Sequence, residues 1–229
     1  MASPHGSTAP APHIVWDWNG TLLHDIDVVL EATNAAFAEV GMAGLTLERY
    51  RELYCVPVPE FYRRLLGRSP TDEEWEAMEE AFHRHYFARS DTAALADGAA
   101  ELLAAWVRAG RTQSVCSLAA HDRLGPWLTR LDVAQHFIRV DGNRGDGQVR
   151  GKAAQMARHL AAMTGVDPAR VVVIGDATDD ALAAAHAGAK AVLYTGGSHS
   201  RRSLAGAGVP VVDSLAEAVF VAQEVARRG

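Results

Sequence analysis

The sequence has only two cysteines, no long apolar run and no excess of basic residues. Cys55 and Cys116 are too few for a disulfide scaffold and fit a reducing compartment, so we expect a cytoplasmic protein. No apolar run approaches the ~20 residues that span a bilayer, and we expect no membrane partner. The net charge of −6 also disfavours nucleic acid and anionic lipid as partners, because both bind basic surfaces.

The rest of the composition is that of a folded globular protein. Apolar residues make up 48% and charged residues 22% of the 229, which excludes a compositionally disordered chain. Residues 1–12 are rich in Ala, Pro and Ser and lack the apolar stretch of a signal peptide. We interpret them as a flexible tail, and we expect a monomer or a homodimer.

Short apolar segments predict the strands of a mostly parallel sheet. They alternate little with polar residues, as in strands that are covered on both faces. The segments are 14–16, 114–116, 137–140, 171–175, 191–194 and 209–212. Helical stretches at 99–109, 152–163 and 181–187 lie between them, so the pattern predicts a doubly wound, Rossmann-like α/β fold. Ligands of such folds bind at the carboxyl ends of the strands, which nominates Asp17, Ser117 and Asp176.

Residues 25–92 break this alternation and are predicted to be wholly helical. Thr71 and Glu74 have the spacing of a capping box, and the helix that they open has an apolar stripe that includes Trp75 and Tyr86. An insert of this length is the size of a small domain. The predicted organisation is a tail at 1–12, a core at 13–24 and 93–229, and a helical cap at 25–92.

Two acidic segments at predicted strand ends are candidates for chemistry. Asp17 directly follows the first strand, where it could attack phosphorus or carbon or hold a cation; the alternative is an Asn-Gly turn. Asp176, Asp179 and Asp180 follow the most apolar strand, and a hard cation such as Mg²⁺ would relieve their repulsion. The alternative is a helix N-terminus stabilised by acidic side chains.

Two further candidates could bind an anion. Lys152 begins a helix after the glycine-rich segment 145–151, where its charge opposes the helix dipole unless an anion lies nearby. An ordinary surface lysine is the alternative. Ser117 could donate its hydroxyl to a phosphate oxygen, or it could be a strand-end serine with its hydrogen bonds satisfied locally.

Together and in this order, these elements resemble the four motifs of the haloacid dehalogenase (HAD) superfamily. The first motif is similar to Asp17-Trp18-Asn19-Gly20-Thr21, the second to Ser117 and the third to Lys152. The fourth is similar to Gly175-Asp176 with Asp180, and the Ala-rich segment 181–189 resembles phosphoglycolate-phosphatase-like members. A helical insert between the first two motifs is typical of members with a helical cap.

The resemblance implies a Mg²⁺-dependent phosphatase that acts on a small phosphorylated metabolite. Asp17 would be the nucleophile that forms an aspartyl-phosphate. Asp176 would bind Mg²⁺ together with Asp17 and the backbone carbonyl of Asn19, with Asp180 in support. Ser117, Lys152 and the backbone N–H groups of Trp18, Asn19 and Gly20 would hold the phosphate.

Asn19 departs from the family pattern, in which an Asp protonates the leaving oxygen and activates water. Asn cannot exchange a proton, so the sequence predicts a preference for good leaving groups such as acyl or aryl phosphates. Two alternatives stay open: a phosphotransferase or mutase with a long-lived phosphoenzyme, and a weakened protein that binds a phosphorylated ligand.

The cap is expected to select the substrate. Its candidate residues have the ordinary alternatives of a core stripe or a solvated face, and His24 is interpreted as a hinge residue. The candidates are Tyr50, Tyr54, Arg63, Arg64, His83 and Tyr86. The segment 198–202 is interpreted as a loop on the rim of the core.

Overall fold

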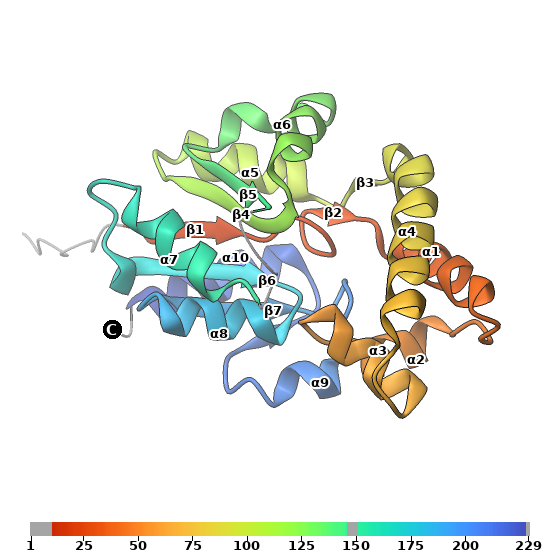
Figure 1. Ribbon diagram of the computed structural model, residues 1–229. Coiled ribbons are helices and arrows are strands. Elements are labelled where there is room, and N and C mark those ends of the chain that lie inside the picture. Colours follow the sequence, from red (N-terminus) through yellow and green to blue (C-terminus); the bar gives the residue numbers. More distant parts are fainter. Residues whose placement is uncertain (1–10, 146–150, 228–229) are drawn as a thin grey trace, which may run out of the picture.

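The computed structural model describes residues 11–145 and 151–227 and contains a six-stranded parallel sheet (Figure 1). The strand order is β5-β4-β1-β6-β7-β8. The strands are β1 (His13–Trp16), β4 (Gln113–Ala120), β5 (Val140–Asn143), β6 (Val171–Gly175), β7 (Lys190–Tyr194) and β8 (Val211–Val212). The predicted fold class is confirmed. Most of the predicted tail and part of segment 145–151 lie outside the described residues.

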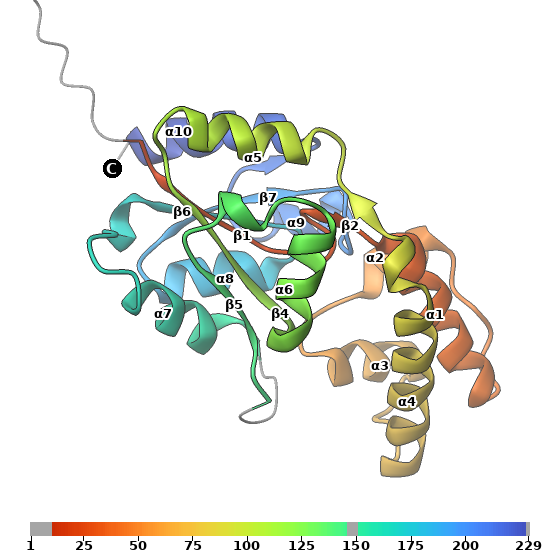
Figure 2. The same cartoon turned by 90° about the horizontal axis from the view of Figure 1, so that it is seen from above.

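Helices cover both faces of the sheet, which explains why its strands are apolar throughout. In Figure 2, α5 and α10 lie on one face, and α7 and α8 lie on the other. The apolar side chains of these helices belong to two separate buried clusters, one on each face. Alternate residues of β1 contribute to both: Ile14 and Trp16 belong to one cluster and Val15 to the other. The core helices are α5 (Ala99–Arg108), α6 (His121–Arg130), α7 (Ala153–Ala161), α8 (Thr178–His186), α9 (Arg201–Ala205) and α10 (Leu215–Arg227).

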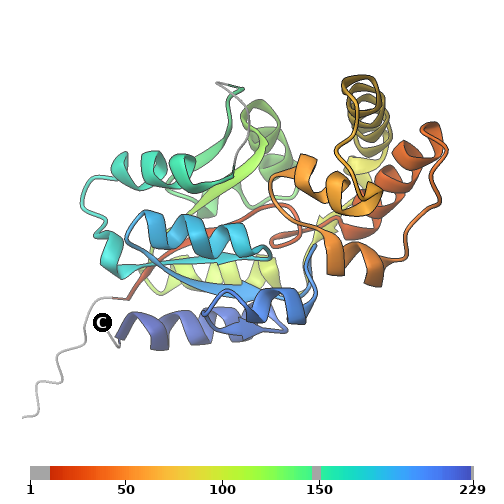
Figure 3. The ribbon, with the colours of Figure 1, turned by 60° about the horizontal axis from the view of Figure 1, so that its bottom comes forward.

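Four helices of the insert stand beyond one end of the sheet (Figure 3). They are α1 (Ile26–Glu39), α2 (Leu47–Leu53), α3 (Val58–Leu66) and α4 (Asp72–Arg89). We call them the cap. A small antiparallel pair, β2 (Leu23–His24) with β3 (Ala94–Leu95), connects the cap to the core at both of its ends. The capping box of Thr71 and Glu74 opens α4 as the sequence predicts.

Several elements differ from the sequence predictions. The β4 strand does not end at Ser117 but continues to Ala120 through an irregular register with β5. The β5 strand lies at 140–143 instead of 137–140, and the rim segment 198–202 includes the start of α9. The helices α6 and α10 and the β2–β3 pair are not anticipated. In the described ranges, none of the helices combines the length and apolar character that a bilayer span requires.

A chain of polar side chains, all buried except Thr112, links β1, β4, α7 and β5. His13 contacts Thr112 Oγ1 and Ser114 Oγ, each at 2.8 Å. Ser114 Oγ lies 2.8 Å from His159 Nε2, and His159 Nδ1 lies 2.7 Å from Asp141. If both imidazoles are neutral, one consistent direction of donors from Thr112 to Asp141 satisfies every atom. Burial lowers the pKa of His13 to about 4 and also lowers that of His159.

We predict that His13 makes stability depend on pH. Its pKa rises from about 4 to 6.5 on unfolding, so in that range the unfolded chain binds more protons and stability increases with pH. Urea unfolding of wild type and His13→Gln at several pH values isolates this effect. The wild type should gain up to about 3 kcal/mol relative to the variant between pH 4 and pH 7. A difference that does not change with pH would contradict a buried neutral His13.

Candidate active site

The carboxyl ends of neighbouring strands bring three acidic side chains together. Asp17 follows β1 and Asp176 follows the adjacent β6, while Asp180 lies in the first turn of α8. One oxygen from each carboxylate lies within 4.8 Å of the others, and all three residues are buried. The structure therefore brings these three predicted residues together, because parallel strands end at a common edge.

The acidic cluster is electrostatically unfavourable without a counter-charge. Burial raises the pKa of Asp176, and repulsion from Asp17 and Asp180 raises it further. Burial also raises the pKa of Asp17, although Lys152 opposes that shift. Buried carboxylates that repel one another form a donor set suited to a hard divalent cation.

Lys152 supplies the positive charge of the cluster. It is the N-cap residue of α7, and its Nζ lies 2.7 Å from Asp17 Oδ1 and also pairs with Asp180. Burial opposes the charge of Lys152, but the two carboxylates outweigh this and raise its pKa. Asp179 accepts a 2.7 Å hydrogen bond from the Lys152 backbone, so it orients Lys152 and is not a member of the cluster. The anions that the sequence predicted near Lys152 are thus carboxylates of the protein.

A glycine-rich loop after β7 holds Asp176, whereas the sequence indicated no role for it beyond that of a loop on the rim of the core. The Ser198 backbone N–H donates to Asp176 Oδ2 at 2.6 Å, and Thr21 contacts Oδ1 at 3.4 Å. A Cβ atom on Gly197 would lie 2.1 Å from Asp176, and Gly20 has a φ of +71° with the same close approach. The pair Gly196-Gly197 directly after a strand was the available signal for this loop.

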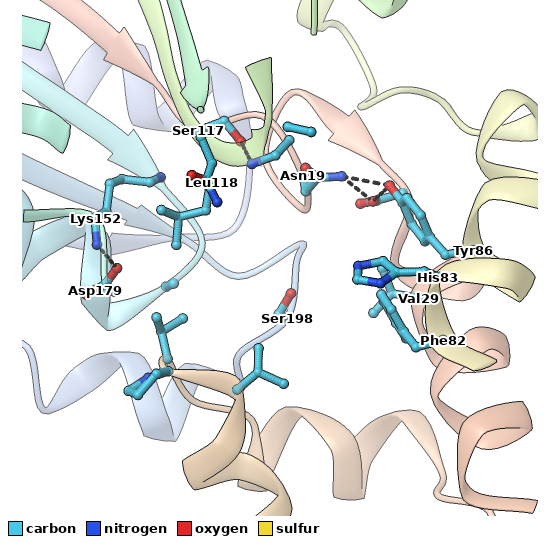
Figure 4. Close-up of a pocket in the computed structure, with 18 of the residues that line it drawn as sticks. Asn19, Val29, Phe82, His83, Tyr86, Ser117, Leu118, Lys152, Asp179 and Ser198 are labelled. Carbon is cyan, nitrogen blue, oxygen red and sulfur yellow. Dashed lines mark hydrogen bonds between the residues drawn. The ribbon is translucent and has the colours of Figure 1, made fainter. Parts of the chain in front are cut away.

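Asn19 points away from Lys152 and toward the cap (Figure 4). Its Nδ2 donates to Asp25 Oδ2 at 2.7 Å and to the Tyr86 hydroxyl at 2.8 Å. Tyr86 donates in turn to Asp25 at 2.7 Å, and the Gly20 N–H donates to the other oxygen at 2.9 Å. Burial raises the pKa of Asp25, but these three donors stabilise its carboxylate form. Asn19 therefore joins the loop after β1 to the cap.

The predicted phosphate-binding residues are only partly free for that role. The Gly20 N–H already donates to Asp25 Oδ1 and Leu23 O, which is at odds with its predicted contact to phosphate. The Trp18 backbone N–H donates to the Asp17 carboxylate and is likewise already engaged. Ser117 is buried and lines the same cavity as Asp17 and Lys152, and its Oγ accepts from the Ala119 N–H at 3.1 Å.

Arg51 of α2 forms a second connection between the cap and the core. Its guanidinium donates to the carbonyls of Gly197 at 2.8 Å and Gly196 at 3.0 Å. The Ser200 N–H donates back to the Arg51 carbonyl at 3.0 Å. Sequence reasoning passed over Arg51 in favour of Arg63 and Arg64, which instead pair with Glu60 on the exposed surface of α3.

A cavity of about 1540 Å³ lies between the cap and the acidic cluster. The predicted cap residues Tyr50, Tyr54, His83 and Tyr86 line it, whereas Arg63 and Arg64 do not. Asn19, Ser117, Lys152 and the three carboxylates of the cluster line it as well. The site is thus a partly open cavity with a charged floor on the core side and the cap on the opposite side.

Comparisons with known proteins agree with this architecture. The sequence profile of the haloacid dehalogenase-like hydrolases matches residues 12–188. A phosphoglycolate phosphatase of Cereibacter sphaeroides is 27% identical over 192 residues, covering 81% of this chain and 86% of the relative.

Two solved structures share the fold at lower identity. A predicted phosphatase from Clostridium acetobutylicum superposes with a TM-score of 0.80 at 16% identity, covering 94% of this chain and 100% of that one. Protein Tyrosine Kinase A of Mycobacterium tuberculosis has a TM-score of 0.77 at 24% identity, covering 93% and 99%. At these identities the structures establish the fold, and they do not discriminate between activities.

Proposed function

The chain belongs to the haloacid dehalogenase-like hydrolases and is a phosphatase of that family, and we propose that it hydrolyses phosphomonoesters through an aspartyl-phosphate on Asp17. The observation that carries the proposal is the ion pair of Asp17 with Lys152, at the floor of a cavity and beside two further buried carboxylates. A carboxylate held in this way is positioned to attack phosphorus, and the adjacent ammonium can neutralise phosphate oxygens. We further propose that the enzyme is cytoplasmic, which its two free, buried cysteines support.

The reaction would proceed in two displacements at phosphorus. An oxygen of Asp17 would attack phosphorus, the ester P–O bond would break, and the leaving oxygen would take the bonding electron pair and then a proton from water. Water then attacks the aspartyl-phosphate, releases inorganic phosphate and restores Asp17. Throughout, Lys152 and Ser117 would contact the phosphoryl oxygens, and the buried setting strengthens these interactions.

Mg²⁺ is the cofactor that fits the acidic cluster. Asp17 and Asp176 would bind it directly, with the Asn19 backbone carbonyl, and Asp180 would support it. When bound, the ion neutralises charge on the transferred phosphoryl group. Three carboxylates balanced by one lysine leave net negative charge at the site, which is what a divalent cation requires.

Asn19 keeps a second function open, that of a phosphotransferase with a long-lived phosphoenzyme. Its amide cannot donate a proton to a leaving group or activate water, and its Nδ2 already donates to Asp25 and Tyr86. Hydrolysis of the aspartyl-phosphate therefore lacks the usual general base, which would slow transfer to water. Hydrolysis is the primary proposal, because every other predicted catalytic group is retained.

We predict that Asp17→Asn abolishes phosphate release. The amide is a poor nucleophile, so turnover of 4-nitrophenyl phosphate should fall by about 10⁴-fold or more. The same substitution at exposed Asp97 is the matched control and should retain wild-type turnover. Circular dichroism verifies that both variants are folded. If folded Asp17→Asn keeps a tenth of the activity, the covalent mechanism is wrong.

We predict that Mg²⁺ stabilises the protein against thermal unfolding. A ligand present at 100 times its Kd adds about 2.7 kcal/mol to the native state, which raises the Tm measurably. Asp176→Asn should lose this Mg²⁺-dependent shift, whereas Asp97→Asn should keep it. Calorimetric melts with Mg²⁺ and with chelator make the comparison without any activity measurement. Identical wild-type melts in the two conditions would rule against a Mg²⁺ site.

We predict that restoring an acid at position 19 requires a second change. In Asn19→Asp, a new carboxylate would face Asp25 Oδ2, which now lies 2.7 Å from the amide nitrogen. In the double variant Asn19→Asp with Asp25→Asn, the new amide at position 25 can donate to the new carboxylate at position 19. The double variant should increase kcat/KM for ethyl phosphate by up to about 10²–10⁴-fold and change 4-nitrophenyl phosphate little.

The single variants Asn19→Asp and Asp25→Asn are the controls for this exchange. In each of them, kcat/KM for ethyl phosphate should increase less than in the double variant. A uniform loss for both substrates in the double variant would mean that Asn19 has a positive function of its own. That result would favour the phosphotransferase.

A further inference from the structure

The cap side of the cavity is built from aromatic rings. Phe82, His83, Tyr86 and Phe87 form a ring face on α4, in which Phe82 stacks on Tyr86 with centroids 5.7 Å apart. His83 stacks on Phe87 at 5.5 Å. Figure 4 shows Phe82, His83 and Tyr86 across the cavity from Lys152 and Ser117. A substrate whose phosphate contacts Lys152 would therefore direct its alcohol portion toward these rings.

Apolar residues of α3 and the preceding loop extend this surface. Val56, Val58 and Phe61 line the cavity, and Val58 keeps 37% of its surface exposed at the start of α3. An exposed valine in the wall of a substrate cavity can be covered by an apolar part of a substrate. The core contributes Trp127 to the same cavity.

The cap places no lysine or arginine in the cavity to pair with an anionic substrate tail. It contains no lysine, and none of its seven arginines lines the cavity. Arg51 binds backbone carbonyls, and the other six pair with glutamates on the cap surface. Glu79 and Asp25 add acidic groups to the lining. Burial of a substrate carboxylate here would leave it without a lysine or arginine partner on the cap, which is unfavourable.

Two arginines that the structure describes on the core side of the cavity, Arg123 and Arg144, already have partners. Arg123 lies 3.7 Å above the ring of Phe87, and Arg144 contacts His121 at 2.9 Å and Asp141 at 3.8 Å. The cavity volume, about 1540 Å³, also exceeds the ~300–1,000 Å³ of ordinary small-molecule sites. A two-carbon carboxylated phosphoester would neither fill this space nor find a lysine or arginine partner on the cap.

We propose that the substrate is a phosphomonoester of an uncharged aromatic or apolar alcohol, whose apolar portion packs against the ring face of α4. This inference rests on the proposed phosphatase function. Asn19 supports it independently, because an aryl leaving group departs as a stable phenolate and needs little protonation. Attack by Asp17 would break the P–O ester bond, release a phenolate, or an alkoxide that takes a proton from water, and leave the phosphoryl group on Asp17.

Binding of phosphonates tests the proposal without turnover. Titration calorimetry of the full chain in Mg²⁺ buffer would compare phenylphosphonate, methylphosphonate and phosphonoacetate. Phenylphosphonate should bind about tenfold or more tightly than the other two, a difference of about 1.4 kcal/mol. Phosphonoacetate should bind no better than methylphosphonate. If phosphonoacetate binds most tightly, the proposal is overturned.

Two pairs of variants locate the effect on the cap. Phe82→Leu should remove most of the preference for phenylphosphonate, whereas Phe220→Leu, on the exposed surface of α10, should retain it. Val58→Arg should improve phosphonoacetate binding about tenfold through a new ion pair, and Val58→Gln should not. The gain in Val58→Arg does not depend on whether Phe82→Leu folds stably. Unchanged ligand ratios in both Phe82→Leu and Val58→Arg would overturn the proposal.

Turnover of matched substrates separates this inference from the proposed function. Benzyl phosphate and ethyl phosphate both release an alkyl alcohol, so a higher kcat/KM for benzyl phosphate reports contacts with the ring, not leaving-group quality. Phosphate release with phosphoglycolate favoured over benzyl phosphate would overturn the substrate class and leave the phosphatase intact. Release from none of these esters would reject the phosphatase, while the phosphonate titration would still decide what the cavity binds.

Discussion

The ion cluster of Asp17, Asp180 and Lys152 with Asp176 is the interaction on which the site depends. Three buried carboxylates share one buried ammonium, so the folded chain keeps unbalanced negative charge where it is least well solvated. The sheet makes this possible, because β1 and β6 are hydrogen-bonded neighbours and carry Asp17 and Asp176 to the same edge. The large apolar clusters on both faces of the sheet supply the stability that such an arrangement requires.

The fold and the charged floor of the site could be predicted because their signals are local. Apolar runs such as 171–175 mark strands, and each is followed directly by the residue that matters, as with Asp176. Parallel strands end at a common edge, so separate positions in the sequence imply proximity in space. The same reasoning misplaced the end of β4, because an irregular pairing with β5 lets that strand continue past Ser117.

The contacts between cap and core could not be predicted, because each depends on where a distant helix lies. The sequence indicated Asn19 as a departure from the family pattern, but its partner Tyr86 is 67 positions away on α4. Arg51 is one of seven arginines in the cap, and nothing in its neighbourhood distinguishes it from those on the surface. Its partners are backbone carbonyls, which have no signature in a sequence.

The Arg51 contacts connect the position of the cap to the orientation of Asp176, and so to the binding of any ligand at the acidic cluster. Arg51 holds the carbonyls of Gly196 and Gly197, and the next residue, Ser198, donates its backbone N–H to Asp176. A movement of α2 away from the core would release the segment that orients Asp176. The converse then follows from thermodynamic linkage. A ligand that binds more tightly when Asp176 is held in place also favours the position of the cap near the core, by the same free energy. The cap and the floor of the site are therefore a coupled pair, and the link between them is three residues of backbone.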